Sequence, residues 1–137
     1  MKNDNPQVKD VTQRFEYYKS LGERAMQQVD DDALFWQPGE QSNSIAIIVG
    51  HLAGNMRSRW SDFLTSDGEK EWRNRDSEFE NSIQTKEDMM TKWNDGWDCL
   101  FNALDTINTE NFNTRIYIRN QSQSITEAIN RQFGHYI

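Results

Sequence analysis

The sequence predicts one all-α domain, a four-helix bundle, over residues 1–137. Four segments repeat apolar residues at intervals of three and four, which is the spacing of one face of an α-helix. Polar stretches with turn-forming residues separate these segments. A chain of 137 residues is also close to the usual size of one domain and leaves no length for a second core. Each helix can then bury its apolar face against the other three.

The first helix is expected over residues 7–29 and the second from Ser42 or Ser44 to Leu64. Pro38 and Gly39 form a turn between them. Either serine can cap the second helix, because a hydroxyl oxygen accepts from the first free backbone N–H groups. The expected inward positions are Val8, Val11, Phe15, Tyr18, Leu21, Ala25 and Val29 in the first helix, and Ile45, Val49, Leu52, Met56, Trp60 and Phe63 in the second.

The third helix is expected over residues 85–107 and the fourth over 124–137. Thr85 with Asp88, and Ser124 with Glu127, match the capping box that starts a helix. The fourth helix reaches the last residue without a closing glycine, a basic final turn or a proline, so it is predicted to be cut short. The expected inward positions are Met89, Trp93, Trp97, Leu100, Leu104 and Ile107 in the third helix, and Ile125, Ile129, Gln132 and Tyr136 in the fourth.

Two connections differ from simple turns. Residues 65–82 lack helical periodicity and combine mixed charges with Trp72 and Phe79, which suits a dimer contact. Residues 114–119 alternate apolar and polar side chains, which predicts a short extended segment before the last helix. The domain is therefore expected to have one long crossing connection and one short extended one.

Composition excludes several classes of partner. A net charge of -7 repels the phosphates of nucleic acids and anionic lipid headgroups, so neither is expected to bind. No apolar run approaches the roughly 18 residues of a membrane span, and the N-terminus has no apolar signal region, so a cytoplasmic location is predicted. The single cysteine, Cys99, cannot form an internal disulfide and is expected to pack as a small apolar side chain.

The chemistry-bearing candidates are two histidines, since phosphate-binding, dinucleotide-binding and common hydrolase motifs do not occur. His51 lies roughly 10 to 14 Å into the second helix and His135 roughly 16 Å into the fourth, so parallel neighbouring helices would bring the rings together, and antiparallel helices nearly so. The glycines beside the two histidines, Gly50, Gly54 and Gly134, let a neighbouring backbone approach closely or leave space for a ligand. Facing helices of a bundle are a common place for metal sites. The alternative is that both histidines are hydrogen-bonded residues at the edge of the core.

Polar residues accompany His51 along its helix. Asn55 and Asp62 are spaced from it by multiples of three and four, in a row with Ile48 and Ser58. They are candidate partners that orient the histidine, or substitute metal ligands. Candidate substrate contacts are Arg57 and Arg59, which can orient an anion, and Trp60, which can line a pocket with Trp72, Trp93 and Trp97. The simpler interpretation places the arginines in solvent and the tryptophans in the core.

Long stretches of the chain resemble an uncharacterised branch of the DinB-like superfamily of four-helix bundles. The residues that carry the resemblance are 44–64 (SIAIIVGHLAGNMRSRWSDFL), 67–70 (DGEK), 72–76 (WRNRD) and 127–136 (EAINRQFGHY), together with the tryptophan-rich third helix. The resemblance implies a divalent metal, usually zinc or nickel, held by one histidine on the second helix and an HxxxH pair on the fourth. His51 matches the first of these ligands and His135 the first of the pair. The third ligand would fall four residues after His135, beyond Ile137.

The resemblance also implies an activity. Characterised relatives include thiol-dependent transferases and isomerases that use low-molecular-weight thiols such as bacillithiol or mycothiol. On this basis we expect a metal-dependent transferase or hydrolase that acts on a small molecule. We also expect the protein to form a homodimer. A bound metal would lower the pKa of a thiol or water. The alternative is a non-catalytic bundle, a dimeric binding or structural protein whose metal site is degenerate.

Overall fold

The computed structural model describes residues 5–39, 42–78, 83–108 and 110–136. These residues are mostly helical, as predicted, and also form one small antiparallel sheet. In chain order the elements are α1 (Pro6–Gln27), the 3-10 helix η1 (Asp32–Phe35), α2 (Ile45–Trp60), α3 (Arg75–Glu78), α4 (Lys86–Asp105), β1 (Ile116–Ile118), β2 (Gln121–Gln123) and α5 (Ile125–Tyr136). No helix in the described ranges combines the length and the apolar character needed to cross a membrane.

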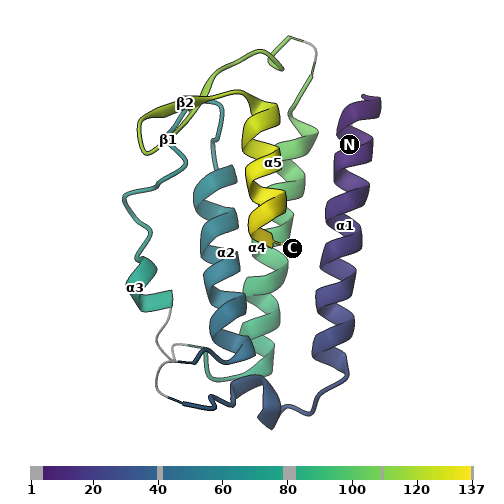
Figure 1. Cartoon of the computed structure of the whole chain (residues 1–137), viewed down its shortest axis with the longest axis vertical. Helices are drawn as coiled ribbons and strands as arrows, with labels where there is room; N and C mark the ends of the chain where they lie inside the picture. The colour runs from purple at the N-terminus through teal and green to yellow at the C-terminus, as the bar shows by residue number, and fades with distance from the viewer. Residues whose placement is uncertain (1–4, 40–41, 79–82, 109, 137) are drawn as a thin grey trace.

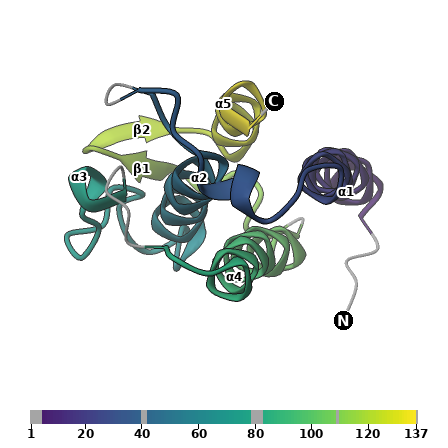
Figure 2. The same cartoon turned by 90° about the horizontal axis from the view of Figure 1, so that it is seen from below.

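The four long helices lie side by side (Figure 1). Helices α1 and α5 run in one direction, and α2 and α4 run in the other. The connection between α2 and α4 therefore has to return along the whole of α2, and it carries α3 on the way. Viewed along the helices, α2 lies between α4 on one side and α5 and the sheet on the other (Figure 2). Helix α2 is consequently covered from several sides, which places its polar residues inside the molecule.

The inner face of α1 differs from the predicted face in its second half. Leu21 is 39% exposed, and Val29 lies beyond the end of the helix with 37% of its surface exposed. Gly22 and Met26 face the core instead. The reason is the indole ring of Trp93, since a Cβ added at Gly22 would come within 2.7 Å of it. The large ring packs best where α1 has no side chain, so the buried face follows the glycine.

Helix α2 starts at the predicted serine and ends early. The hydroxyl of Ser44 accepts from a backbone N–H three residues later at 3.1 Å, so Ser44 and not Ser42 caps the helix. The helix ends at Trp60, before the predicted end at Leu64. Asp62 adopts a left-handed conformation with φ of 48°, which an α-helix cannot contain. The apolar pattern continues past Trp60 because Phe63 is still buried, although it is outside the helix.

The last two long helices begin as their capping signals predict. Thr85 accepts from the N–H of Asp88 at 3.0 Å at the start of α4. At the start of α5 the capping box is complete, because Ser124 accepts from the N–H of Glu127 at 3.0 Å and Glu127 accepts from the N–H of Ser124 at 3.2 Å. The six inward residues predicted for the third helix are all buried, and the last of them lies two positions beyond the end of α4 at Asp105: Met89, Trp93, Trp97, Leu100, Leu104 and Ile107.

Aromatic contacts and one glycine join the helices. The ring of Phe15 in α1 stacks on Phe133 of α5 at 4.2 Å and meets Trp97 of α4 edge-on at 6.3 Å between centroids. Helices α2 and α4 approach closely where Gly96 faces Ala53, since a Cβ at Gly96 would lie 3.0 Å from the Cα of Ala53. These contacts fix the relative positions of all four long helices.

The connection before α5 is a β-hairpin held by Asp67. The predicted extended segment is β1, and β2 pairs with it through a two-residue turn at Arg119 and Asn120, with φ of 53° and 64°. The Asp67 carboxylate accepts from both turn N–H groups, at 2.8 Å and 2.7 Å. Partial burial raises the pKa of Asp67, but the N–H groups of Asn120, Glu69 and Arg119 together lower it below its usual value. The hairpin is thus tied to the segment that follows α2.

Candidate functional site

The two histidines meet between α2 and α5. Their ring centroids are 5.5 Å apart, with the ring planes at 68°. The two helices run antiparallel and not parallel, so the arrangement that the residue count favoured is wrong in direction. The rings still lie at the same level, because His51 is about halfway along α2 and His135 is near the end of the shorter α5. Two imidazole rings from separate helices are therefore side by side.

A buried carboxylate binds His51 from the other side. The Nδ1 atom of His51 lies 3.1 Å from an oxygen of Glu78, the last residue of α3. Arg73 donates to both oxygens of Glu78, each at 2.9 Å. The Arg73 side chain is only 2% exposed and that of Glu78 is 11% exposed. This bidentate pair holds the carboxylate in place beside the His51 ring.

Gly54 makes room for the Glu78 carboxylate. A Cβ added at Gly54 would lie 2.0 Å from one carboxylate oxygen, well inside contact distance. The sequence predicted that the glycines beside His51 leave space for a neighbouring backbone or a ligand. At Gly54 the space is filled by the side chain of Glu78, which can approach the α2 backbone only because no side chain projects there.

Positive charge surrounds the second histidine. Partial burial of the ring is the largest cause that lowers the pKa of His135, and His51 and the guanidinium groups of Arg59, Arg73 and Arg75 lower it further. The neutral form of His135 is therefore favoured at neutral pH. Neutral imidazole is the form that can bind a metal ion or accept a proton.

Arg59 is buried and holds the segment after α2. Its guanidinium donates to the backbone oxygen of Gly68 at 2.6 Å and to the carboxylate of Glu69 at 3.0 Å. The neighbouring Ser58 donates to the same Gly68 oxygen at 2.6 Å. The sequence proposed Arg59 as a substrate contact; the contacts that the structure gives it are with its own chain. The Nε atom of Arg59 has no hydrogen-bond partner in the described part of the chain.

The other candidates fall into three places. Asn55 is buried on α2, one turn after His51. Asp62 lies past the helix end and roughly 14 Å or more along the axis from His51, so it leaves the polar row and lines a separate hollow near Cys99. Trp60 is buried in the core, where it meets Phe63 edge-on.

Arg57 and Trp72 lie on the surface together. The guanidinium carbon of Arg57 is 5.6 Å from the centroid of the Trp72 ring, which is a cation–π arrangement. Trp72 is 57% exposed, so the interpretation that places it in the core is wrong, whereas the alternative that it lines a pocket is confirmed. The residue lies in the connection between α2 and α3, where the chain runs along the outside of α2.

Cys99 is a half-buried residue of α4. Its sulfur lies 3.3 Å from the hydroxyl oxygen of Ser61. The two residues line a mainly apolar hollow of about 420 Å³ at the end of α2. The Cys99 side chain packs against the core, as predicted, but it is only partly buried there.

Comparison with known proteins identifies a family. The model of a family described as "Protein of unknown function (DUF1572)" matches residues 3–137. The chain belongs to the DUF1572 family. No match was found among curated proteins or among solved structures. The activity of this DUF1572 protein therefore has to be argued from its own residues.

Two imidazoles are the metal-binding side chains that this site of the DUF1572 protein brings together. In residues 5–39, 42–78, 83–108 and 110–136, no group of three or more His, Cys, Asp and Glu residues is placed to hold one. Glu78 is bonded to His51 and to Arg73, which is the position of a group that orients a ligand. The donor set fits a two-histidine site completed by water or by another ligand.

Proposed function

We propose that this DUF1572 protein is a four-helix bundle of the DinB type that binds a divalent metal, zinc or nickel, through His51 and His135. The activity proposed with it is that of a thiol-dependent transferase or a hydrolase acting on a small molecule. The single observation that supports the proposal is the 5.5 Å separation of two imidazole rings from helices far apart in the sequence. A low-molecular-weight thiol or a small organic substrate is the proposed partner.

The hydrogen bond to Glu78 supports this role for His51. A histidine that ligates a metal usually donates its other ring N–H to a carboxylate or carbonyl, which fixes the tautomer and raises the basicity of the ligating nitrogen. Glu78 contacts Nδ1 at 3.1 Å, so Nε2 is the nitrogen that would bind the metal. Arg73 donates to both oxygens of Glu78 and so positions the carboxylate beside Nδ1.

The lowered pKa of His135 supports the second ligand. A metal ion competes with protons for the imidazole nitrogen. Because His135 has a lowered pKa, less of the metal affinity is lost to protonation at pH 7. The chemistry that a divalent metal supplies when bound is a lower pKa for a thiol or a water molecule beside it. The cationic groups of Arg59 and Arg73 near the pair favour an anionic form of such a molecule.

The alternative function is a non-catalytic bundle with a degenerate site. The observation that favours it is the two-histidine donor set in the described part of the chain. Catalytic zinc normally has three protein ligands and one open position. Metal affinity decides between the two functions, because a degenerate site would hold zinc or nickel weakly.

The test is metal analysis of protein purified without a histidine tag, loaded with zinc or nickel and dialysed. We expect about one equivalent of metal in the native protein and loss of that metal in both His51→Ala and His135→Ala. Glu78→Gln, which keeps the size of the side chain, should weaken binding by about 10–100-fold, as changes to groups behind a metal ligand do.

The control is the circular dichroism spectrum and the unfolding midpoint of each variant, which show that the helices are intact. Equal metal content in the native protein and in both folded alanine variants would favour the non-catalytic bundle. A metal that depends on His51 alone would contradict the shared site.

A further inference from the structure

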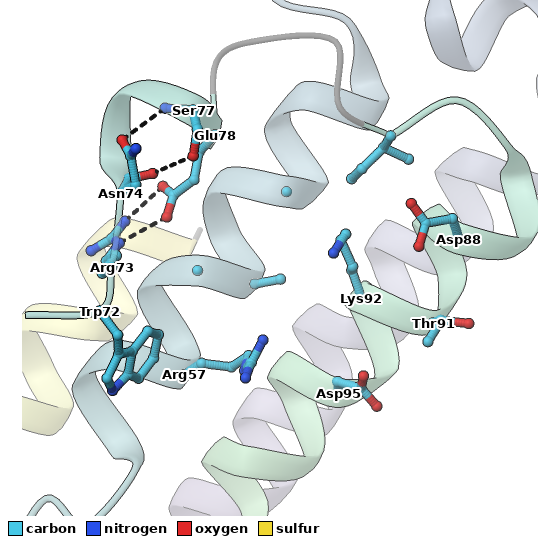
Figure 3. Close-up of a pocket in the computed structure, with 14 residues that line it drawn as sticks. Arg57, Trp72, Arg73, Asn74, Ser77, Glu78, Asp88, Thr91, Lys92 and Asp95 are labelled. Carbon is cyan, nitrogen blue, oxygen red and sulfur yellow. Dashed lines mark hydrogen bonds and ion pairs between the residues drawn. The ribbon is translucent and has the colours of Figure 1, made fainter. Parts of the chain in front are cut away.

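A cleft lies on the side of α2 that faces α4. Figure 3 shows its floor on α2, one wall formed by the segment from Trp72 to Glu78, and the opposite wall formed by α4. Its volume is about 340 Å³, near the lower end of the range of about 300–1,000 Å³ typical of small-molecule sites. The floor consists of residues with small side chains or none, namely Gly50, Ala53 and Gly54. The cleft and the histidine pair share the Glu78 carboxylate as a wall.

Two cationic side chains project into the cleft from different helices. Arg57 extends from α2 and Lys92 from α4, and Figure 3 shows both in the space between the helices. Neither forms an ion pair with an acidic side chain in the described ranges. Asp88 and Asp95 are one turn away from Lys92 on the same helix, and no ion pair joins them to it. Three carboxylates also line the cleft, and Figure 3 shows none of them between Arg57 and Lys92, since Glu78 is paired with Arg73 and the two aspartates lie on α4. The space between the two cations therefore favours an anion.

The Trp72 ring fixes one of these cations and gives the cleft an apolar edge. Its face holds the Arg57 guanidinium at 5.6 Å from the centroid, which limits the positions available to the charge. More than half of the indole surface remains in water, at 57% exposure. A ligand with an apolar body would cover part of this surface and gain the free energy of burying it.

A buried guanidinium in the wall has one unused donor. The Arg73 side chain lines the cleft and is 2% exposed, and its Nη1 atom has no hydrogen-bond partner in the described residues. Other atoms cover this nitrogen, so a ligand in the cleft could bond to it only after a side chain moves. Hydroxyl and amide groups of Asn74, Ser77 and Thr91 add further polar contacts along the walls.

We propose that this cleft binds a small organic anion, a carboxylate held between Arg57 and Lys92 with an apolar body over Gly50 and Ala53 and against Trp72. The site is independent of a metal at His51 and His135. Charge selects the ligand in this proposal, because the two cations attract a carboxylate and repel an ammonium group of the same size.

The test uses three probes of one shape and different charge: benzoate, benzamide and benzylammonium. Each is titrated into metal-free protein at constant ionic strength, and binding is followed by NMR through the indole N–H signal that Trp72→Phe removes. We expect a saturable shift with benzoate and none with benzamide or benzylammonium, at concentrations up to roughly 10 mM, the weak end of ligand affinities.

Charge-neutral variants then identify the contacts. Arg57→Gln and Lys92→Gln should each weaken benzoate binding by about tenfold, the loss of one charge-assisted hydrogen bond. Lys86→Gln is the matched control on α4, since Lys86 is paired with Asp31 and does not line the cleft, and it should bind benzoate as the native protein does. Equal affinity for the neutral probe, tighter binding of the cationic probe, or no saturable shift with benzoate would overturn the proposal. Because metal is absent throughout, its failure would leave the metal site untouched.

Discussion

Two glycines on adjacent helices show how one missing side chain has different consequences. At Gly96 of α4 an added Cβ would meet the backbone of Ala53 at 3.0 Å, so this glycine sets the distance between α2 and α4. At Gly54 of α2 an added Cβ would meet the carboxylate of Glu78 at 2.0 Å, so this glycine seats a charged group. The missing side chain at Gly96 therefore allows close helix packing, and the missing side chain at Gly54 allows Glu78 to reach His51. A side chain added at Gly96 would meet backbone, which cannot rotate away, whereas one added at Gly54 would meet the end of a side chain, which can move.

The largest effect on stability should come from the carboxylate itself. Glu78→Ala leaves the Arg73 guanidinium buried, at 2% exposure, without its ion-pair partner. Removing one partner of a buried pair costs about 3–5 kcal/mol, and we expect a loss in this range in the free energy of unfolding, measured by urea denaturation. Glu78→Gln, which can still accept one hydrogen bond, should lose less. A loss below about 1 kcal/mol for Glu78→Ala would show that Arg73 finds another partner or reaches water.

A smaller loss is expected at the helix contact. Gly96→Ala forces α2 and α4 apart by a few tenths of an ångström, because its Cβ meets backbone that cannot rotate away. Overpacking of this kind costs about 1–3 kcal/mol in the free energy of unfolding. Gly134→Ala is the reference on α5, since nothing lies within 4 Å of its added Cβ. It should stabilise the protein by about 0.5–1 kcal/mol, the helix preference of alanine over glycine. Similar changes in the free energy of unfolding for Gly96→Ala and Gly134→Ala would show that Gly96 does not set the distance between the helices.

The smallest change in stability should accompany Gly54→Ala, together with the clearest change at the site. The carboxylate of Glu78 would have to leave α2, and the helix preference of alanine offsets part of the cost. We expect a net change below about 1 kcal/mol, with loss of the His51 to Glu78 hydrogen bond. The measurement is the NMR signal of the His51 Nδ1 proton, with Gly134→Ala as control. An unchanged signal would mean that the contact with Glu78 does not depend on the space at Gly54.

The helices were predictable because their signals are local. Each capping residue lies within three positions of the N–H it accepts, as with Thr85 and Ser124. The inward residues of α4 follow strict helical spacing, and all of them are buried. The end of α2 was not predictable, since the apolar pattern continues to Phe63 while the left-handed backbone of Asp62 has already ended the helix. In α1 the buried face depends on Trp93, a residue of another helix.

The site was predictable only in part, for the same reason. The rise per residue along a helix was enough to place the two histidines at one level. It could not give the direction of α5, nor identify Glu78, which is 27 positions from His51 in the chain. Glu78 lies in a connection without periodicity, so no pattern marks it. The signal that was present is Gly54 one turn from His51, because a glycine inside a helix marks a close approach by some other group.

The contact between Asp67 and the hairpin turn has a consequence for the order of folding. Helices can form on contacts of three or four positions, but Asp67 must find Arg119 and Asn120 at separations of 52 and 53 positions. Bringing such distant segments together has an entropic cost that is repaid only when the intervening helices have already shortened the path. We therefore expect the last helix, with His135, to be positioned late, and the histidine pair to assemble near the end of folding.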